Sequence, residues 1–100
     1  MGQEAIVPVE GRIDASSAPL LLERIESVLD SRPDHLLIDL RAASYVSSSG
    51  MRVLLIAHRR QQALGGTLSL INTPDKILRI LHIAGFDQVF DLLPSDGAHS

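Results

Sequence analysis

Hydrophobic and polar positions along the chain follow two periods, and the changes between them divide it into strands and helices. Short runs of β-prone residues are typical of strands, which we expect at residues 5–9, 36–40, 67–71 and 89–92. In the longer segments between these runs, apolar residues recur every three or four positions, which indicates amphipathic helices. We expect the helices between Ser17 and Ser31, from Ser49 to about Leu64, and between Thr73 and Gly85.

Turn and cap residues mark the ends of these elements. Ser16–Pro19 supplies a hydroxyl cap before a proline, and Thr73–Asp75 supplies a cap, a proline at the first helical position and an acid in the first turn. The pair Gly65-Gly66 ends the second helix. Gly11–Asp14 is expected to end the first strand, and Arg41–Ser44 is expected to form a polar loop after the second.

Regular alternation of strands and helices predicts an α/β fold. We expect the order β-α-β-α-β-α-β, with a mixed, mostly parallel sheet of about four strands and crossover helices. A chain of 100 residues forms one domain, here residues 1–100, with a core at about 5–92 and a disordered tail at 94–100. The unbroken apolar run at 36–40 is typical of a central strand, whereas Pro8 favours an edge strand.

Composition limits the functions open to this chain. The net charge of −3 and the aromatic content of 3% argue against nucleic acid binding, which needs basic surfaces and stacking platforms. The sequence has no cysteine, which excludes disulfides and suits a reducing cytosol. No apolar stretch approaches the roughly 20 residues that cross a bilayer. We therefore expect a cytoplasmic protein without membrane insertion or cofactor, whose partner is another protein.

Three hydroxyls precede a glycine where the second predicted helix begins. Serine is a preferred helix cap and glycine relieves crowding in a turn, so Ser47-Ser48-Ser49-Gly50 has a purely structural interpretation. The free N–H groups and the positive dipole end of a helix start also favour an anion. A phosphate on one of these serines would leave the domain folded and would change what docks on the loop.

Three segments together resemble a known family. Leu40–Leu55, with its serines and glycine between a strand and a helix, resembles the Asp-Ser-Ser-Gly-Leu signature of STAS-domain anti-sigma factor antagonists. Gly11–Ala18 is similar to the Gly-Glu-Leu-Asp segment before the first helix of that family. Arg79–Phe86, with Val89-Phe90, resembles its closing helix, glycine and last strand. The resemblance covers roughly residues 5 to 92 and implies a STAS-type fold.

The resemblance also implies how the serine loop works. In the family, a serine at the position of Ser48 is phosphorylated by an anti-sigma factor that is itself an ATP-dependent serine kinase, and a phosphatase removes the phosphate. The unphosphorylated protein binds the anti-sigma factor and releases the sigma factor, whereas the phosphorylated protein does not bind. The implied partner-binding residues of this chain, none of them catalytic, are Asp14, Ser47, Ser48, Ser49, Gly50, Met51 and Arg52.

Two departures from the family pattern leave alternatives open. Ser47 stands where the family has Asp, so the phosphate acceptor could be Ser47 or Ser49, or phosphorylation could be absent. The extra N-terminal strand of the family is nearly absent, which leaves the strand with Pro8 at the sheet edge and allows a monomer or a weak dimer. The alternative function is a non-phosphorylated STAS interaction subunit of a transporter or signalling complex.

Catalytic and metal-binding interpretations fit the residues less well. The serine loop lacks the glycine two residues before the nucleophile that a hydrolase elbow requires, and His58 falls on the apolar stripe of a helix. No two histidines have the i, i+3 or i, i+4 spacing of helical metal ligands, so His35 and His82 are expected at the surface or in an interface. Asp14 and Asp39 lack the adjacent acids of a phospho-receiver domain. We expect neither an enzyme nor a metal site.

Overall fold

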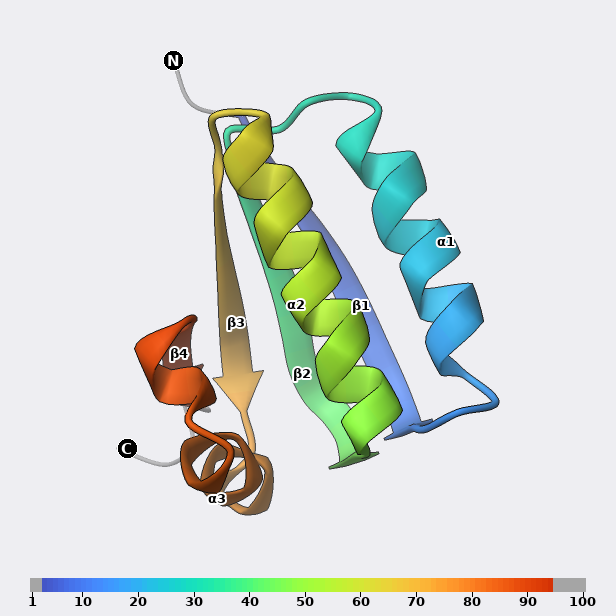
Figure 1. Cartoon of the computed structure of the whole chain (residues 1–100), viewed down its shortest axis with the longest axis vertical. Helices are drawn as coiled ribbons and strands as arrows, with labels where there is room; N and C mark the ends of the chain where they lie inside the picture. The colour runs from blue at the N-terminus through green and yellow to red at the C-terminus, as the bar shows by residue number, and fades with distance from the viewer. Residues whose placement is uncertain (1–2, 95–100) are drawn as a thin grey trace.

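A computed structural model describes residues 3–94 of the chain, which form a four-stranded parallel sheet in the order β1-β2-β3-β4 with helices between the strands (Figure 1). The elements are β1 (Glu4–Ile13), α1 (Ala18–Leu29), β2 (His35–Val46), α2 (Ser48–Ala63), β3 (Thr67–Thr73), α3 (Asp75–Ile83), the 3₁₀ helix η1 (Phe86–Gln88) and β4 (Asp91–Pro94). The predicted α/β fold and element order are confirmed. No helix among these residues is long and apolar enough to cross a membrane.

The core lies between the sheet and the helices that pack on it. α1 and α2 lie side by side over one face of the sheet (Figure 1). Buried side chains alternate along β2 at Leu36, Ile38 and Leu40, and they share one cluster with Ile25 of α1 and Leu54 of α2. Since few residues are aromatic, aliphatic side chains provide most of the hydrophobic stabilisation.

The two first strands are longer than the sequence pattern predicts. β1 continues through Gly11 to Ile13, and β2 continues through Arg41–Ser44, so the predicted strand end and the predicted polar loop are both wrong. The pairing of β1 with β2 shifts register between Pro8 and Glu10 and again after Gly11, which has a φ of 71°. Such bulges interrupt the apolar alternation of a strand without ending its hydrogen bonding, and this explains the error.

Two predicted helix caps are also different in the structure. Ser17 occupies the N-cap position of α1, but its hydroxyl donates to the Arg12 carbonyl at 2.7 Å and caps no helical N–H. Thr73 is the buried last residue of β3, and Pro74 is the N-cap of α3. Both elements still begin where the signal predicts, because the proline fixes a backbone angle that suits the first turn. α2 is expected from Ser49 to about Leu64 and is observed one residue earlier at each end.

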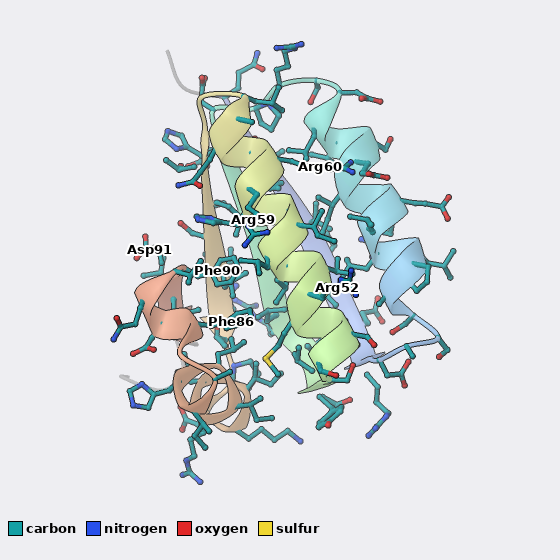
Figure 2. All side chains as sticks on the ribbon, viewed as in Figure 1. Arg52, Arg59, Arg60, Phe86, Phe90 and Asp91 are labelled. Carbon is teal, nitrogen blue, oxygen red and sulfur yellow. The ribbon has the colours of Figure 1, made fainter. Side chains whose placement is uncertain are left out.

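The chain between α3 and β4 packs aromatic rings against α2. Figure 2 shows Phe86 and Phe90 directed from η1 and the turn after it towards α2, and their ring centroids are 5.4 Å apart. Phe90 is buried and directly precedes β4. The observed strand therefore begins at Asp91, two residues later than the strand predicted at 89–92. Apart from Pro94, which ends β4, the predicted disordered tail at 94–100 lies outside the described residues.

β1 is an edge strand, as Pro8 and the departure from the family's extra N-terminal strand predict. It pairs with β2 alone among the described strands. Pro8 has no N–H to offer a further strand, and its carbonyl oxygen accepts a hydrogen bond of 2.7 Å from the Arg24 guanidinium of α1. The middle of this edge is therefore closed to strand addition.

Candidate functional site

Two loops meet at the carboxyl ends of β1 and β2. The backbone N–H of Ser47, just after β2, donates to the carbonyl of Ile13, the last residue of β1, at 2.8 Å. Asp14 directly follows Ile13, and α2 begins directly after Ser47. The structure thus brings together the two segments that the sequence singles out, and it does so at the edge where ligand and partner sites of parallel sheets occur.

The three serines of the loop have different environments. Ser47 is the N-cap of α2 and is half-buried, and its hydroxyl oxygen accepts a hydrogen bond of 3.2 Å from the Gly50 N–H. Ser49 is also half-buried, whereas Ser48 is exposed in the first turn of the helix. Ser48 is therefore the most exposed serine of the loop.

Gly50 is buried where the start of α2 crosses the end of β1. A Cβ atom at this position would lie 2.6 Å from Cγ2 of Ile13 and 2.8 Å from its carbonyl oxygen. Contacts this short do not occur between unstrained atoms. Glycine is thus required here for close packing, and it allows the serine loop to lie against the end of β1.

Asp14 organises the loop between β1 and α1. Its Oδ1 accepts hydrogen bonds from the Ser16 hydroxyl at 2.8 Å and from the backbone N–H groups of Ser16 at 3.0 Å and Ser17 at 3.2 Å. Its Oδ2 lies 3.7 Å from Nε of Arg12. The Ser16 hydroxyl, followed by these backbone donors, lowers the pKa of Asp14 below its ordinary value. The carboxylate is charged and fixed beside the serine loop.

The remaining predicted partner residues, Met51 and Arg52, differ in exposure. Met51 is half-buried against the hydrophobic core, so most of its side chain serves packing. Arg52 is exposed one turn after Ser48 and projects from α2, as do Arg59 and Arg60 (Figure 2). The Arg60 guanidinium forms an ion pair with Glu26 of α1 and so links the two helices. Arg52 is the one of these cations that lies beside the serine loop.

Two features of this edge of the molecule were not predicted from the sequence. The Arg12 guanidinium lies 4.5 Å from the centre of the Tyr45 ring, and the two residues are register partners on β1 and β2. A groove of about 240 Å³ runs between β1 and α1, with the exposed Leu20 on its wall. Leu20 could have been identified as an apolar residue outside the helical stripe. The Arg12–Tyr45 pair depends on the bulge and has no signal in the local sequence.

The histidines and Asp39 take part in local contacts. Nδ1 of His35 lies 2.8 Å from the Thr67 hydroxyl, and Nδ1 of His82 lies 2.9 Å from Asp87. The His58 ring meets Phe90 edge-on at 5.1 Å, in keeping with its predicted place on an apolar stripe. Asp39 accepts hydrogen bonds from the N–H of Arg41 and the side chain of Asn72. Within residues 3–94 no three potential metal ligands gather in one place.

Comparison with known proteins places this geometry in a family. The family model for the STAS domain matches residues 2–97. The chain is 31% identical over 86 residues to the anti-sigma-B factor antagonist of Bacillus subtilis, a match that spans 86% of this chain and 78% of that protein.

Solved structures with the same fold include regulators and a transporter protein. An anti-sigma factor antagonist from Mycobacterium paratuberculosis superimposes with a TM-score of 0.84 at 28% identity, over 96% of this chain and 81% of that one. A sulfate transporter family protein from Wolinella succinogenes gives a TM-score of 0.79 at 19% identity, over 94% and 79% of the two chains. At this identity the second likeness supports the fold alone. The family model and the curated relative together establish that this chain belongs to the STAS domain family.

Proposed function

We propose that this domain is an anti-sigma factor antagonist that is switched off by reversible phosphorylation of Ser48. It acts in the cytoplasm as a binding module and catalyses no reaction. Its partners are an anti-sigma factor with serine kinase activity and a phosphatase that removes the phosphate. Its docking surface is formed by Asp14, Ser47, Ser48, Ser49, Gly50, Met51 and Arg52.

The observation that carries the proposal is the exposure of Ser48 between two half-buried serines. Ser47 uses its hydroxyl to cap α2, and Ser49 is half-buried, so a kinase reaches Ser48 without unwinding the helix. The first turn of α2 contains no acidic residue. A phosphate there meets the positive end of the helix dipole and no opposing carboxylate on the same turn, so the domain stays folded when it is modified.

Phosphorylation would change the charge of the docking surface. A phosphoserine carries a charge of about −1.5 to −2 at neutral pH. The Asp14 carboxylate, whose lowered pKa keeps it ionised, already lies in the neighbouring loop. A partner that binds against the Asp14 carboxylate and the uncharged serine loop loses affinity when a second, larger negative charge must be desolvated beside it.

The test incubates the domain with each anti-sigma factor serine kinase of its source organism and ATP, and locates phosphate by tandem mass spectrometry. We expect one phosphate on Ser48, none in Ser48→Ala, and an unchanged yield in the matched control Ser49→Ala. Ser48→Asp should lose binding to the anti-sigma factor in calorimetry, while Ser48→Ala should bind constitutively. Equal affinity of Ser48→Asp and the parent domain would contradict the switch.

A second candidate function is the alternative left open by Ser47, which stands where the family has Asp. In this alternative the same surface binds a transporter or signalling subunit and is never phosphorylated. Intact mass measured on the protein from native cells separates the two functions, because the switch requires a phosphorylated fraction. A purified complex with a transporter subunit and no phosphate under any growth condition would select the alternative.

A further inference from the structure

The face of the sheet opposite the core carries a layer of side chains that no described element covers. Along each strand, the residues that alternate with the buried ones are half-buried or exposed. α1 and α2 lie on the other face (Figure 1), and the buried residues of α3 belong to the same core cluster as theirs. Parallel sheets in proteins are almost always covered on both faces, usually by helices. This open face is therefore the most unusual feature of the molecule.

The open face has an apolar centre that crosses all four strands. Ile6 of β1 is 57% exposed and is paired with Leu37 of β2, and Leu93 of β4 is 44% exposed. Ile71 of β3, which is half-buried, is the register partner of Asp39. Leu37 is in register with Ser69, so these four apolar side chains form a band that crosses the strands diagonally, with Ser69 and Asp39 between them. Burying each of the four against a partner would be favourable.

Acidic side chains flank this apolar band. Glu4 and Glu10 lie on β1 before and after Ile6, Asp39 lies between Leu37 and the end of β2, and Asp91 begins β4. Within residues 3–94 none of these four carboxylates forms an ion pair. Of the arginines on these strands, Arg41 is exposed two residues after Asp39, and Arg12 already contacts Asp14 and the Tyr45 ring. Asp39 accepts hydrogen bonds from the Arg41 N–H and the Asn72 side chain, and Asp91 accepts one from the Ser69 hydroxyl. The open face thus carries four carboxylates that have no ion-pair partner among the described residues.

The charges favour one kind of occupant over a second copy of the domain. Two copies packed face to face would bring Glu4, Asp39 and Asp91 of one protomer against acidic residues of the other, and the repulsion opposes such a dimer. A helix is the element that normally covers a parallel sheet, and a helix with basic residues beside its apolar stripe would form ion pairs with these carboxylates. We propose that the open face, defined by Ile6, Leu37, Ile71 and Leu93, docks an amphipathic helix of a partner protein whose apolar stripe is flanked by Lys and Arg.

This surface is separate from the serine loop. Ile6 lies in the amino-terminal half of β1, whereas Asp14 and Ser48 follow the carboxyl ends of their strands. A partner can therefore occupy the open face whether or not Ser48 is phosphorylated. The proposal goes beyond the switch, and the variants that test it leave the serine loop unchanged.

The first experiment titrates the isotope-labelled domain with an 18-residue helical peptide of Leu and Lys, in which Leu forms a single stripe, and follows backbone amides by NMR. We expect shifts centred on Ile6, Leu37 and Ile71. Ile6→Gln should weaken binding by about tenfold or more, because it removes most of one buried aliphatic side chain. Ile83→Gln, at a residue that is 83% exposed on α3, is the matched control and should bind as the parent does.

Charge provides the second arm of the test. Glu4→Lys should weaken the Leu/Lys peptide, and a peptide with Glu in place of Lys should not bind. The proposal is overturned if shifts centre on α1, α2 or α3, if both peptides bind equally, or if Ile6→Gln and Ile83→Gln behave alike. It is also overturned if sedimentation of the domain alone gives a dimer that Ile6→Gln dissociates, since a second copy would then be the occupant.

A photo-crosslinking amino acid at Ile6 in the native host identifies the natural occupant. We expect the crosslinked peptide to lie in a helix with Lys or Arg beside an apolar stripe, and the same probe at Ile83 should not capture it. A crosslinked peptide that is acidic, or that comes from this chain itself, would refute the proposal.

Discussion

Replacing Gly50 with alanine tests whether the serine loop is held in place by close packing on β1. The new Cβ would lie 2.6 Å from Cγ2 of Ile13 and 2.8 Å from the Ile13 carbonyl oxygen, so α2 must move or Ile13 must leave its position. Ile13 is 1% exposed, and its carbonyl oxygen is fixed by the hydrogen bond from the Ser47 N–H. Inserting a methyl group into such a packed position costs about 1–3 kcal/mol.

An opposing effect must be weighed against this cost. Alanine is a better helix former than glycine by about 1 kcal/mol in a helix interior, and by less in the first turn, where Gly50 lies. The clash therefore exceeds the gain, and we expect Gly50→Ala to lower the free energy of unfolding by about 1–2 kcal/mol. For a domain of this size that corresponds to a fall in Tm of about 4–16 °C.

Urea denaturation followed by circular dichroism measures this loss, and two further variants interpret it. Ser48→Ala changes an exposed residue of the same turn and should stay within about 0.5 kcal/mol of the parent. If the contact with Ile13 causes the loss, the double variant Ile13→Ala with Gly50→Ala loses less than the sum of the single variants. A Gly50→Ala protein as stable as the parent would refute the packing argument.

Three further predictions concern the edge, the core and the charge of the domain. The double variant Pro8→Val with Arg24→Ala restores an N–H to the β1 edge and frees the carbonyl of residue 8 from its hydrogen bond with the guanidinium. We expect more self-association in sedimentation than for the parent, and unchanged sedimentation would contradict protection of this edge. Gln61→Met should lower the free energy of unfolding by about 2–4 kcal/mol in urea denaturation. The buried Gln61 amide donates to the carbonyls of Pro33 at 2.8 Å and Thr67 at 3.1 Å, and both carbonyls would lose this partner. A loss smaller than that of Ser48→Ala would refute this prediction. Asp14→Asn should lower Tm at neutral pH, because the pKa of Asp14 is lower in the folded state than its unfolded-state value of 3.8. The stabilisation by the carboxylate is present above pH 3.8 and is lost as the pH falls through the lower folded-state pKa. A difference in Tm between Asp14→Asn and the parent that persists in stronger acid would contradict this prediction.

The helices were predictable because their signals are local. α2 begins at Ser48 and ends at Ala63, against the expected Ser49 and Leu64, since a serine cap and a glycine with a φ of 85° define both ends within a few residues. β2 was predicted to stop at Leu40 because bulges in its pairing with β1 remove the apolar alternation. A bulge depends on how two strands pair, so it cannot be predicted from the sequence of one strand alone.

The candidate site was predictable to the same extent. The meeting of Asp14 with the serine loop follows from the parallel order of β1 and β2, because adjacent parallel strands end at one edge. The stacking of Arg12 on Tyr45 requires the exact register, which is shifted twice along this pair. The burial of Gln61 could not be predicted either. Its hydrogen-bond partners, Pro33 before β2 and Thr67 at the start of β3, are distant from each other in the sequence and are brought together only by the fold.

The serine loop divides its tasks among neighbouring residues, and this division bears on the substitution of Ser47 for the family's Asp. Capping of α2 needs an acceptor oxygen at position 47, which the Ser47 hydroxyl supplies to the Gly50 N–H as an aspartate would. Packing against Ile13 needs the absence of a side chain at Gly50. Neither task involves the Ser48 hydroxyl. A phosphate on Ser48 would therefore break no contact that holds the loop, and with serine at position 47 it would meet less repulsion than beside an aspartate. The substitution thus removes a charge from the proposed docking surface while it preserves the geometry that the proposed switch at Ser48 requires.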